Sequence, residues 1–313
     1  MNAGSLIFQN GGSLSIVQFR TDEINTFEYI SLTNALKNKF VEVKEVSESG
    51  SVNNLSVINH SEYFVFMSDG DILSGAKQNR VLNTSVLVSP RSKVIIPVSC
   101  VEQGRWRYTK TDFSESEYSA PSNIRSEKAK VLFQNLKERK SFMADQSKIW
   151  SEVRNYEKSF FSKSPTSNLS DIFESKKYDI EDFIKRFKIN SGSNGLAVFV
   201  NHKLLNLEIF NREEIYNEYF RKLLRSAAFE TMNLKEKENS LTEAEAFYKT
   251  NTFFDSMSEM KYEVHKGVGA GMEKRFDSKE MTGFELEYEN KMIHYVALNL
   301  SNSESKLRDH SRY

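Results

Sequence analysis

The sequence predicts an α+β fold from three observations. Strand-like apolar segments concentrate in the first 110 residues, helix formers dominate a long proline-free stretch after them, and strand patterns return near the C-terminus as two hairpins separated by helices. We therefore expect a β-rich N-terminal part, a helical section, an α+β C-terminal part and a mobile polar tail, all but the tail joined in one integrated globular unit. These parts are residues 1–110, 111–190, 191–300 and 301–313.

Short apolar segments predict the strands of the N-terminal part. Each is rich in β-branched or aromatic residues and is too short for an independent helix. These segments are residues 14–20, 40–46, 54–59, 63–67, 83–88 and 94–101. The first twelve residues lack the pattern and are interpreted as a loose arm, and the pattern of residues 27–36 is ambiguous.

Apolar residues at steps of three and four predict the helical section, which follows a polar, turn-prone segment over residues 111–123. Helix formers dominate residues 124–161. A continuous helix of this length would approach about 60 Å at about 1.5 Å per residue, so we expect a break near residues 141–145. Pro165 ends the section, and two short helices are expected near residues 169–175 and 180–187.

The C-terminal part opens with a predicted hairpin that turns at Asn201 and His202. Two capping boxes then predict helices, one from Asn211 with Glu214 to about residue 231 and one from Ser240 with the glutamate three positions on to about residue 260. A glycine-rich run and a final pair of strands follow, at residues 265–276, 283–289 and 291–300.

Composition excludes several functional classes. Lys plus Arg equal Asp plus Glu, 43 against 43, so no global field steers the protein toward nucleic acid. We find no stretch of about 18 apolar residues and no signal-peptide pattern, and we expect a cytoplasmic protein without a membrane partner. Cys100 is the single cysteine, and we interpret it as a small buried hydrophobe rather than a nucleophile.

Candidate site residues gather in two polar segments, residues 69–80 and 102–107, which lie between the predicted strands. In the first segment, Gln78, Asn79 and Arg80 combine amide groups with a five-donor guanidinium, which suits carboxylate, phosphate or amide edges. In the second segment, Arg105 and Trp106 place a cation beside an aromatic ring, and Glu102 precedes them. From residue types alone, an internal polar network that joins strand ends is favoured roughly two to one over a ligand site.

The glycine-rich run is a further candidate. Its alternating glycines have the wrong spacing for a dinucleotide fingerprint. Gly269 and its neighbours could instead form an anion-binding nest or simply relieve crowding, and we weigh the two equally. Glu273 and Arg275 alternate on one strand face and are positioned to pair with each other. His265 adjoins the run, and because no histidine has metal-ligand spacing we expect no metal site.

Several sequence strings resemble a known family. GAKQNRVLNTSVLV and IPVSCVEQGRW carry the resemblance, and ADQSKIWSEV, SPTSNL, GLAVFVNHKLLNLEIF, RKLLRSAAFE, HKGVGAGMEKRF and IHYVAL follow in order. Over residues 55–298 the chain resembles the ARG and rhodanese-phosphatase superfamily associated protein family of prokaryotes, in which ARG means ADP-ribosylglycohydrolase. The resemblance implies a setting in ADP-ribose or NAD-derived nucleotide chemistry, in conflict with phage, but implies neither a particular reaction nor a cofactor.

Two hypotheses follow. In the first, both polar segments and the glycine run converge on a pocket for an ADP-ribose-like nucleotide. Arg80 and Arg105 contact its phosphate or carboxylate, and the neighbouring amides orient its base or ribose. Trp106 stacks on the ligand, and Glu102 is the general base if the site is catalytic. The neighbouring amides are Gln78 and Asn79, and the run contributes His265, Gly269, Glu273 and Arg275. In the second, the same residues form an internal network in a non-catalytic scaffold subunit that binds a partner enzyme encoded nearby.

Overall fold

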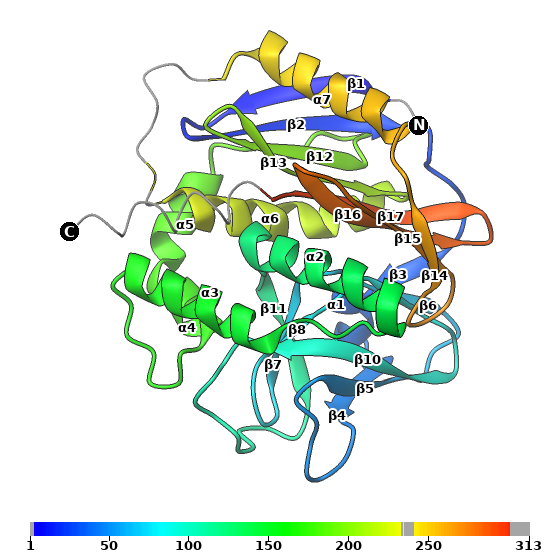
Figure 1. Cartoon of the computed structure of the whole chain (residues 1–313), viewed down its shortest axis with the longest axis vertical. Helices are drawn as coiled ribbons and strands as arrows, with labels where there is room; N and C mark the ends of the chain where they lie inside the picture. Colours follow the sequence, from blue (N-terminus) through cyan, green and yellow to red (C-terminus); the bar gives the residue numbers. More distant parts are fainter. Residues whose placement is uncertain (1–2, 233, 235–240, 301–313) are drawn as a thin grey trace.

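A computed structural model describes residues 3–232, 234 and 241–300. Its largest element is an eight-stranded sheet in which every neighbouring pair is antiparallel (Figure 1). In spatial order its strands are β1 (Ala3–Asn10), β2 (Leu14–Thr21), β12 (Gly195–Val200), β13 (Lys203–Phe210), β17 (Lys291–Asn299), β16 (Met281–Tyr288), β15 (Met272–Asp277) and β14 (Glu263–Lys266). The first two strands thus belong to the sheet that the C-terminal segment completes.

The remaining strands form two smaller sheets. The six-stranded sheet has the order β11 (Phe113–Ser119), β7 (Asp71–Gly75), β8 (Arg80–Leu82), β10 (Ser92–Cys100), β5 (Asn54–Asn59) and β4 (Val41–Glu45). The three-stranded sheet has the order β3 (Tyr29–Ser31), β6 (Phe64–Met67) and β9 (Val86–Val88). Only β3 and β6 pair in parallel among the described strands.

Helices separate and cover the sheets (Figure 1). α7 (Glu243–Met257) packs on one face of the large sheet, where apolar side chains of β2, β12, β13 and β17 form one core cluster. α2 (Ser122–Arg139) and α6 (Glu213–Thr231) lie on the opposite face, between the large sheet and the smaller ones. The shorter helices are α1 (Leu32–Lys37), α3 (Gln146–Ser159), α4 (Leu169–Ser175) and α5 (Lys177–Ile184). This arrangement confirms the predicted α+β class.

Several sequence predictions are confirmed in detail. α2 ends at Arg139, followed by Lys140 in the left-handed region, and the side chain of Asp145 caps the start of α3, so the long helix breaks where its length required. The hairpin of β12 and β13 turns at Asn201 and His202, whose φ angles are 45° and 75°. Two consecutive left-handed residues match the twist of the paired strands.

Other predictions are wrong. The supposed loose arm is strand β1, and the polar segment 111–123 contains strand β11, because pairing with β2 and with β7 overrides weak local patterns. Residues 69–80 likewise contain strand β7 between two turns.

The cap predictions are also corrected. α6 has Arg212 at its N-cap without a side-chain hydrogen bond, so the Asn211 box is absent. Ser240 lies outside the described residues, and the capping box of α7 is formed by Thr242 and Glu245. The mobile tail predicted from residue 301 also falls outside the described part of the chain.

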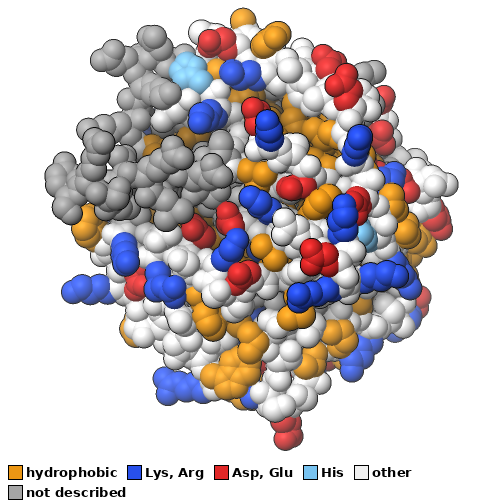
Figure 2. Space-filling view, in the orientation of Figure 1, with side chains coloured by type: hydrophobic (Ala, Val, Ile, Leu, Met, Phe, Trp, Pro, Cys, Tyr) orange, Lys and Arg blue, Asp and Glu red, His pale blue; other side chains and the backbone are white. Residues whose placement is uncertain are grey.

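The surface of the described residues gives little indication of the class of protein. Acidic and basic side chains are interspersed over the visible face, in agreement with the zero net charge (Figure 2). Within the described ranges, no helix combines the length and the apolar content needed for a membrane span.

Candidate functional site

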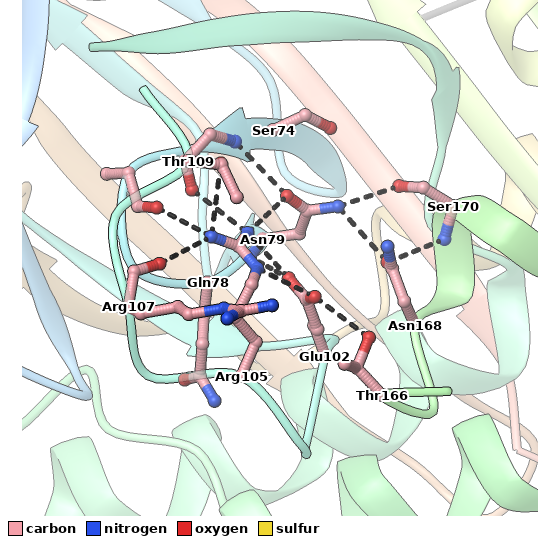
Figure 3. Close-up of polar contacts among 12 residues, drawn as sticks. Ser74, Gln78, Asn79, Glu102, Arg105, Arg107, Thr109, Thr166, Asn168 and Ser170 are labelled. Atoms are coloured by element: carbon pink, nitrogen blue, oxygen red, sulfur yellow. Dashed lines mark hydrogen bonds and ion pairs between the residues drawn. The ribbon is translucent and has the colours of Figure 1, made fainter. Parts of the chain in front are cut away.

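Three loops meet at one end of the six-stranded sheet (Figure 3). The Val101 amide donates to the Asn79 carbonyl at 3.1 Å, and the Leu169 amide donates to the Val101 carbonyl at 2.9 Å. Glu102 and Asn168 form an isolated antiparallel bridge. The strings GAKQNR, CVEQGRW and SPTSNL, which lie far apart in the sequence, therefore come together in space.

Glu102 is at the centre of this convergence. Its carboxylate accepts hydrogen bonds from the Asn79 amide at 3.0 Å, from Arg105 Nε at 2.8 Å and Nη2 at 2.7 Å, and from Thr166 Oγ1 at 2.9 Å. Burial acts to raise its pKa, but the donors led by Arg105 outweigh burial, and the pKa of Glu102 is lowered. The carboxylate is therefore ionised and fully hydrogen-bonded at neutral pH.

Arg105 is equally well satisfied. Its Nη1 donates to the carbonyls of Ala76 and Arg107 at 2.6 and 3.0 Å, and its Nη2 donates to the Gly75 carbonyl at 3.2 Å. Asn79 completes the group: its Oδ1 accepts from the Gly75 amide at 3.1 Å, and its Nδ2 donates to Asn168 Oδ1 at 3.1 Å. We call Asn79, Glu102, Arg105, Thr166 and Asn168 the Glu102 cluster.

The Glu102 cluster has the geometry of a clamp. A general base needs a free lone pair directed at its substrate. The lone pairs of Glu102 are engaged by four donors, and its carboxylate would act on a substrate only after a donor such as Thr166 is released. Sequence reasoning did not single out Thr166 and Asn168, although both belong to the string SPTSNL that carries the family resemblance.

Arg80 contrasts with Arg105. Its side chain is fully buried, and burial lowers the pKa of the guanidinium. Nη1 donates to Gln78 Oε1 at 3.1 Å, whereas Nη2 stands 3.6 Å from Glu45 Oε1, beyond hydrogen-bond distance. Within the described part of the chain, Arg80 Nε and Nη2 and both carboxylate oxygens of Glu45 have no hydrogen-bond partner.

Glu45 was not among the candidate residues predicted from the sequence. It ends the charged strand β4, and alternating charges on a strand usually mark a solvated face. Its side chain is only 3% exposed, because residues 46–53 fold back over it. A buried carboxylate beside a buried guanidinium, both incompletely bonded, is the kind of exception that calls for an explanation.

Aromatic and cationic side chains cover Arg80. The Trp106 ring centroid lies 5.5 Å from the Arg80 guanidinium carbon and 5.5 Å from Lys77 Nζ, and Trp106 is 43% exposed. Lys77 Nζ also donates to the carbonyls of Glu48 and Ser49 at 2.6 and 2.9 Å, which holds the loop of residues 46–53 in place. We call Glu45, Lys77, Gln78, Arg80 and Trp106 the Arg80 site.

Cys100 lies beside this site as a buried free thiol. It pairs with Arg80 across β10 and β8, is fully buried, and has its pKa raised to about 11 by burial. The thiol therefore stays protonated at neutral pH, and the prediction of a buried small hydrophobe is confirmed.

Glu273 and Arg275 lie in a different group. They share one buried face of β15 and form an ion pair, and Thr84 Oγ1 donates to Glu273 at 2.6 Å and accepts from Arg275 Nη2 at 2.9 Å. No hydrogen bond or ion pair joins them to the Glu102 cluster among the described residues. Because every partner is buried, this pairing connects β15 to the turn after β8.

Near this pair, a central network of buried charges links the sheets through α2. Arg125 donates to Asp69 at 2.9 Å and to Glu208 at 2.6 Å, and Lys128 donates to Asp69 at 2.9 Å. A similar link through α6 joins Lys222 to Asp71 at 2.9 Å. These ionisable residues are of types that could act in catalysis or ligand binding, but each is buried and ion-paired, as is typical of structural ion pairs.

Ser85, His294 and Glu208 form a chain that resembles a catalytic triad. Ser85 Oγ lies 2.9 Å from His294 Nδ1, and His294 Nε2 lies 3.3 Å from Glu208 Oε2. Exposure is 1% for Ser85 and zero for the other two. Because no member contacts solvent, the chain serves as a buried joint between β9 and the large sheet.

The glycine run has a packing role at Gly269. A Cβ there would lie 2.2 Å from the Leu87 carbonyl oxygen, and the next amide, of Ala270, donates to that oxygen at 2.8 Å. His265 sits on edge strand β14 opposite Glu273, away from the Arg80 site, and burial lowers its pKa. Across the described residues, no group of three or more His, Cys, Asp or Glu is arranged to hold a metal ion.

The fold and the sites define a protein with three packed sheets, a polar cluster whose groups are fully hydrogen-bonded, and an adjacent buried Arg–Glu pair in which four side-chain atoms have no hydrogen-bond partner among the described residues. The chain belongs to the family of the ARG and Rhodanese-Phosphatase-superfamily-associated Protein domain, whose profile matches residues 6–298. The match includes β2 and the part of β1 from residue 6 on, which the recognisable strings did not reach. No curated protein and no solved structure matches the chain.

Proposed function

We propose that the chain binds an ADP-ribose-like or NAD-derived nucleotide at the Arg80 site. One observation carries the proposal: Arg80 and Glu45 are buried and keep four polar atoms without a hydrogen-bond partner among the described residues, beneath the exposed ring of Trp106. Such atoms are costly to bury unless a ligand or water completes them. The family description names an association with ARG, which supports a ligand from ADP-ribose chemistry. A role in a prokaryotic anti-phage system is part of the same proposal.

The predicted site residues take different roles in this proposal. Arg80 and Gln78 contact the ligand, and Trp106 offers a planar surface for stacking. Arg105, Asn79 and Glu102 act as positioning residues, because their hydrogen bonds hold the loop that carries Trp106. Catalysis by Glu102 remains a secondary proposal that requires release of Thr166.

A thermal-shift experiment tests the binding proposal. Wild type, Trp106→Ala and Tyr63→Ala are compared with ADP-ribose, NAD and inorganic phosphate. Tyr63 is a matched control, since it is 48% exposed and lies on the loop before β6. We expect NAD or ADP-ribose to raise Tm in wild type and Tyr63→Ala, and Trp106→Ala to weaken binding by roughly 5- to 100-fold, as base–aromatic stacking predicts. An identical response in all three proteins would reject the Arg80 site.

A non-catalytic scaffold subunit is the second candidate. The observation in its favour is the Glu102 cluster, whose carboxylate is fully hydrogen-bonded within the chain. In this case the partner is an ARG or rhodanese-phosphatase superfamily protein encoded nearby. Co-elution with such a protein in size-exclusion chromatography, together with no response to nucleotides, would favour the scaffold.

A further inference from the structure

We infer that the Arg80 site recognises a planar edge with a hydrogen-bond acceptor next to an N–H donor, and that it does not bind the diphosphate. This inference rests on the proposed function and narrows it to one part of the nucleotide. Two groups of an NAD-derived ligand have this edge, the carboxamide of nicotinamide and the amino edge of adenine. Both are neutral and planar.

The charge at the site argues against phosphate. Arg80 alone would suit a phosphate, which guanidinium groups bind in a bidentate manner. The Glu45 carboxylate, however, lies 3.6 Å from Arg80 Nη2, and its side chain is buried almost completely. A phosphate that reached Nη2 would meet a second negative charge at short range, where screening by water is weak.

The side-chain atoms of Arg80 and Glu45 that have no hydrogen-bond partner favour a ligand edge that carries both an acceptor and a donor. Arg80 Nε and Nη2 are donors that need an acceptor, and the two oxygens of Glu45 are acceptors that need a donor. The 3.6 Å gap between the side chains keeps them from satisfying each other. A carboxamide satisfies both residues at once through its oxygen and its N–H, and adenine does so through a ring nitrogen and its amino group.

Residues 46–53 control access to the edge. Gly50 adopts φ 77°, and a Cβ at this position would lie 3.3 Å from both Glu45 Oε2 and the Trp106 ring. Lys77 holds this loop by two hydrogen bonds, and Cys100 Sγ contacts the Val52 carbonyl at 3.6 Å. The ligand therefore reaches Arg80 when the loop moves aside, and the loop carbonyls then release Lys77.

Calorimetric titration of the full chain with three dinucleotides tests the inference. NAD carries both edges, 1,N6-etheno-NAD lacks the adenine edge, and nicotinic acid adenine dinucleotide replaces the carboxamide with a carboxylate. We expect one of the two modified ligands to lose about tenfold or more in affinity, because a buried polar group left unpaired costs about 1 to 3 kcal/mol, which corresponds to a loss of about 5- to 150-fold. The weakened ligand identifies the edge that is recognised.

Glu45→Gln provides the residue-level test, and Glu42→Gln is its control, since Glu42 lies on the same strand with a side chain 44% exposed. If the carboxamide is recognised, Glu45→Gln recovers binding of the nicotinic acid ligand; if adenine is recognised, it weakens NAD by about tenfold. The control leaves all affinities unchanged.

The outcomes separate this inference from the proposed function. Equal affinity for all three dinucleotides, or displacement of NAD by inorganic pyrophosphate at similar concentrations, would overturn the inference and leave nucleotide binding intact. Failure of wild type to bind any of the three would overturn the proposed function, and the inference with it. Unfolding of Glu45→Gln, detected by circular dichroism, leaves the ligand series as the deciding result.

Discussion

Two arginines from adjacent polar segments have opposite environments. Arg105 donates to carbonyls, to Asn79 and to Glu102, whereas Arg80 makes one hydrogen bond and leaves two nitrogens without a partner among the described residues. Residue type predicted a ligand contact for both. The structure separates a positioning residue from a candidate ligand residue, and the two roles make different predictions for mutation.

Arg105→Ala should destabilise the fold by about 3 kcal/mol. The substitution leaves the Glu102 carboxylate buried without its main partner, which is the costly way to break a buried pair. Urea unfolding monitored by circular dichroism measures the loss. Arg107→Ala is the control, because that exposed residue contributes only its carbonyl to the cluster. A loss below about 1 kcal/mol would show that Arg105 is not a clamp.

His294 should make stability depend on pH. Burial lowers its pKa below the ordinary value of 6.5, although Glu208 opposes this. The unfolded chain therefore binds a proton that the folded chain does not, and stability decreases as pH falls below about 6.5. The expected slope is up to about 1.4 kcal/mol per pH unit. His294→Gln should remove this slope in urea unfolding between pH 7.5 and 5.5, and an unchanged slope would contradict the assignment.

Residue types predicted most of the candidate residues, but they did not predict which of these residues lie together in the structure. Gln78, Asn79, Glu102 and Arg105 were predicted from their types, and they do meet, but Glu273 and Arg275 belong to another buried pair. Glu45 was missed because its burial depends on a loop that folds back from the following residues. The pattern of polar and apolar residues along one strand does not indicate whether a following loop buries one of its side chains.

At the scale of elements, a glycine fixes how two sheets meet. Gly269 lies between β14 and β15, where a Cβ would lie 2.2 Å from the carbonyl oxygen of Leu87 on β9, and the amide of the next residue, Ala270, donates to that oxygen. Gly269→Ala should therefore destabilise the fold by roughly 1–3 kcal/mol, since the added Cβ displaces backbone. Gly4→Ala is the control, because a Cβ at that position meets only one atom, at 3.9 Å. Equal thermal stability of the two variants in calorimetry would contradict this role.

Element prediction succeeded where the local pattern was strong. The hairpin at Asn201 and the break before α3 were found because turn chemistry and helix length are local properties. β1 and β11 were missed because they are edge strands with weak local patterns, which pairing with β2 and with β7 overrides. The α6 cap was wrong because Arg212 occupies the N-cap position without a side-chain hydrogen bond.

At the scale of the molecule, buried charges join the layers. Arg125 on α2 bridges Asp69, in the turn between β6 and β7, to Glu208 of the large sheet, Lys128 on α2 also pairs with Asp69, and Lys222 on α6 reaches Asp71. These contacts join residues between positions 69 and 222, so no local sequence pattern could reveal them. They hold the six-stranded sheet, and with it the Arg80 site, against the rest of the fold.

The central claim is that a nucleotide binds at the Arg80 site, and fluorescence of Trp106 tests it most directly. The chain has two tryptophans, so Trp150→Phe leaves Trp106 as the single reporter. Titration of this variant with NAD and ADP-ribose should give a saturable change in emission that Arg80→Met reduces by at least about tenfold in affinity. Unchanged emission up to millimolar nucleotide, with the protein folded by circular dichroism, would contradict the claim.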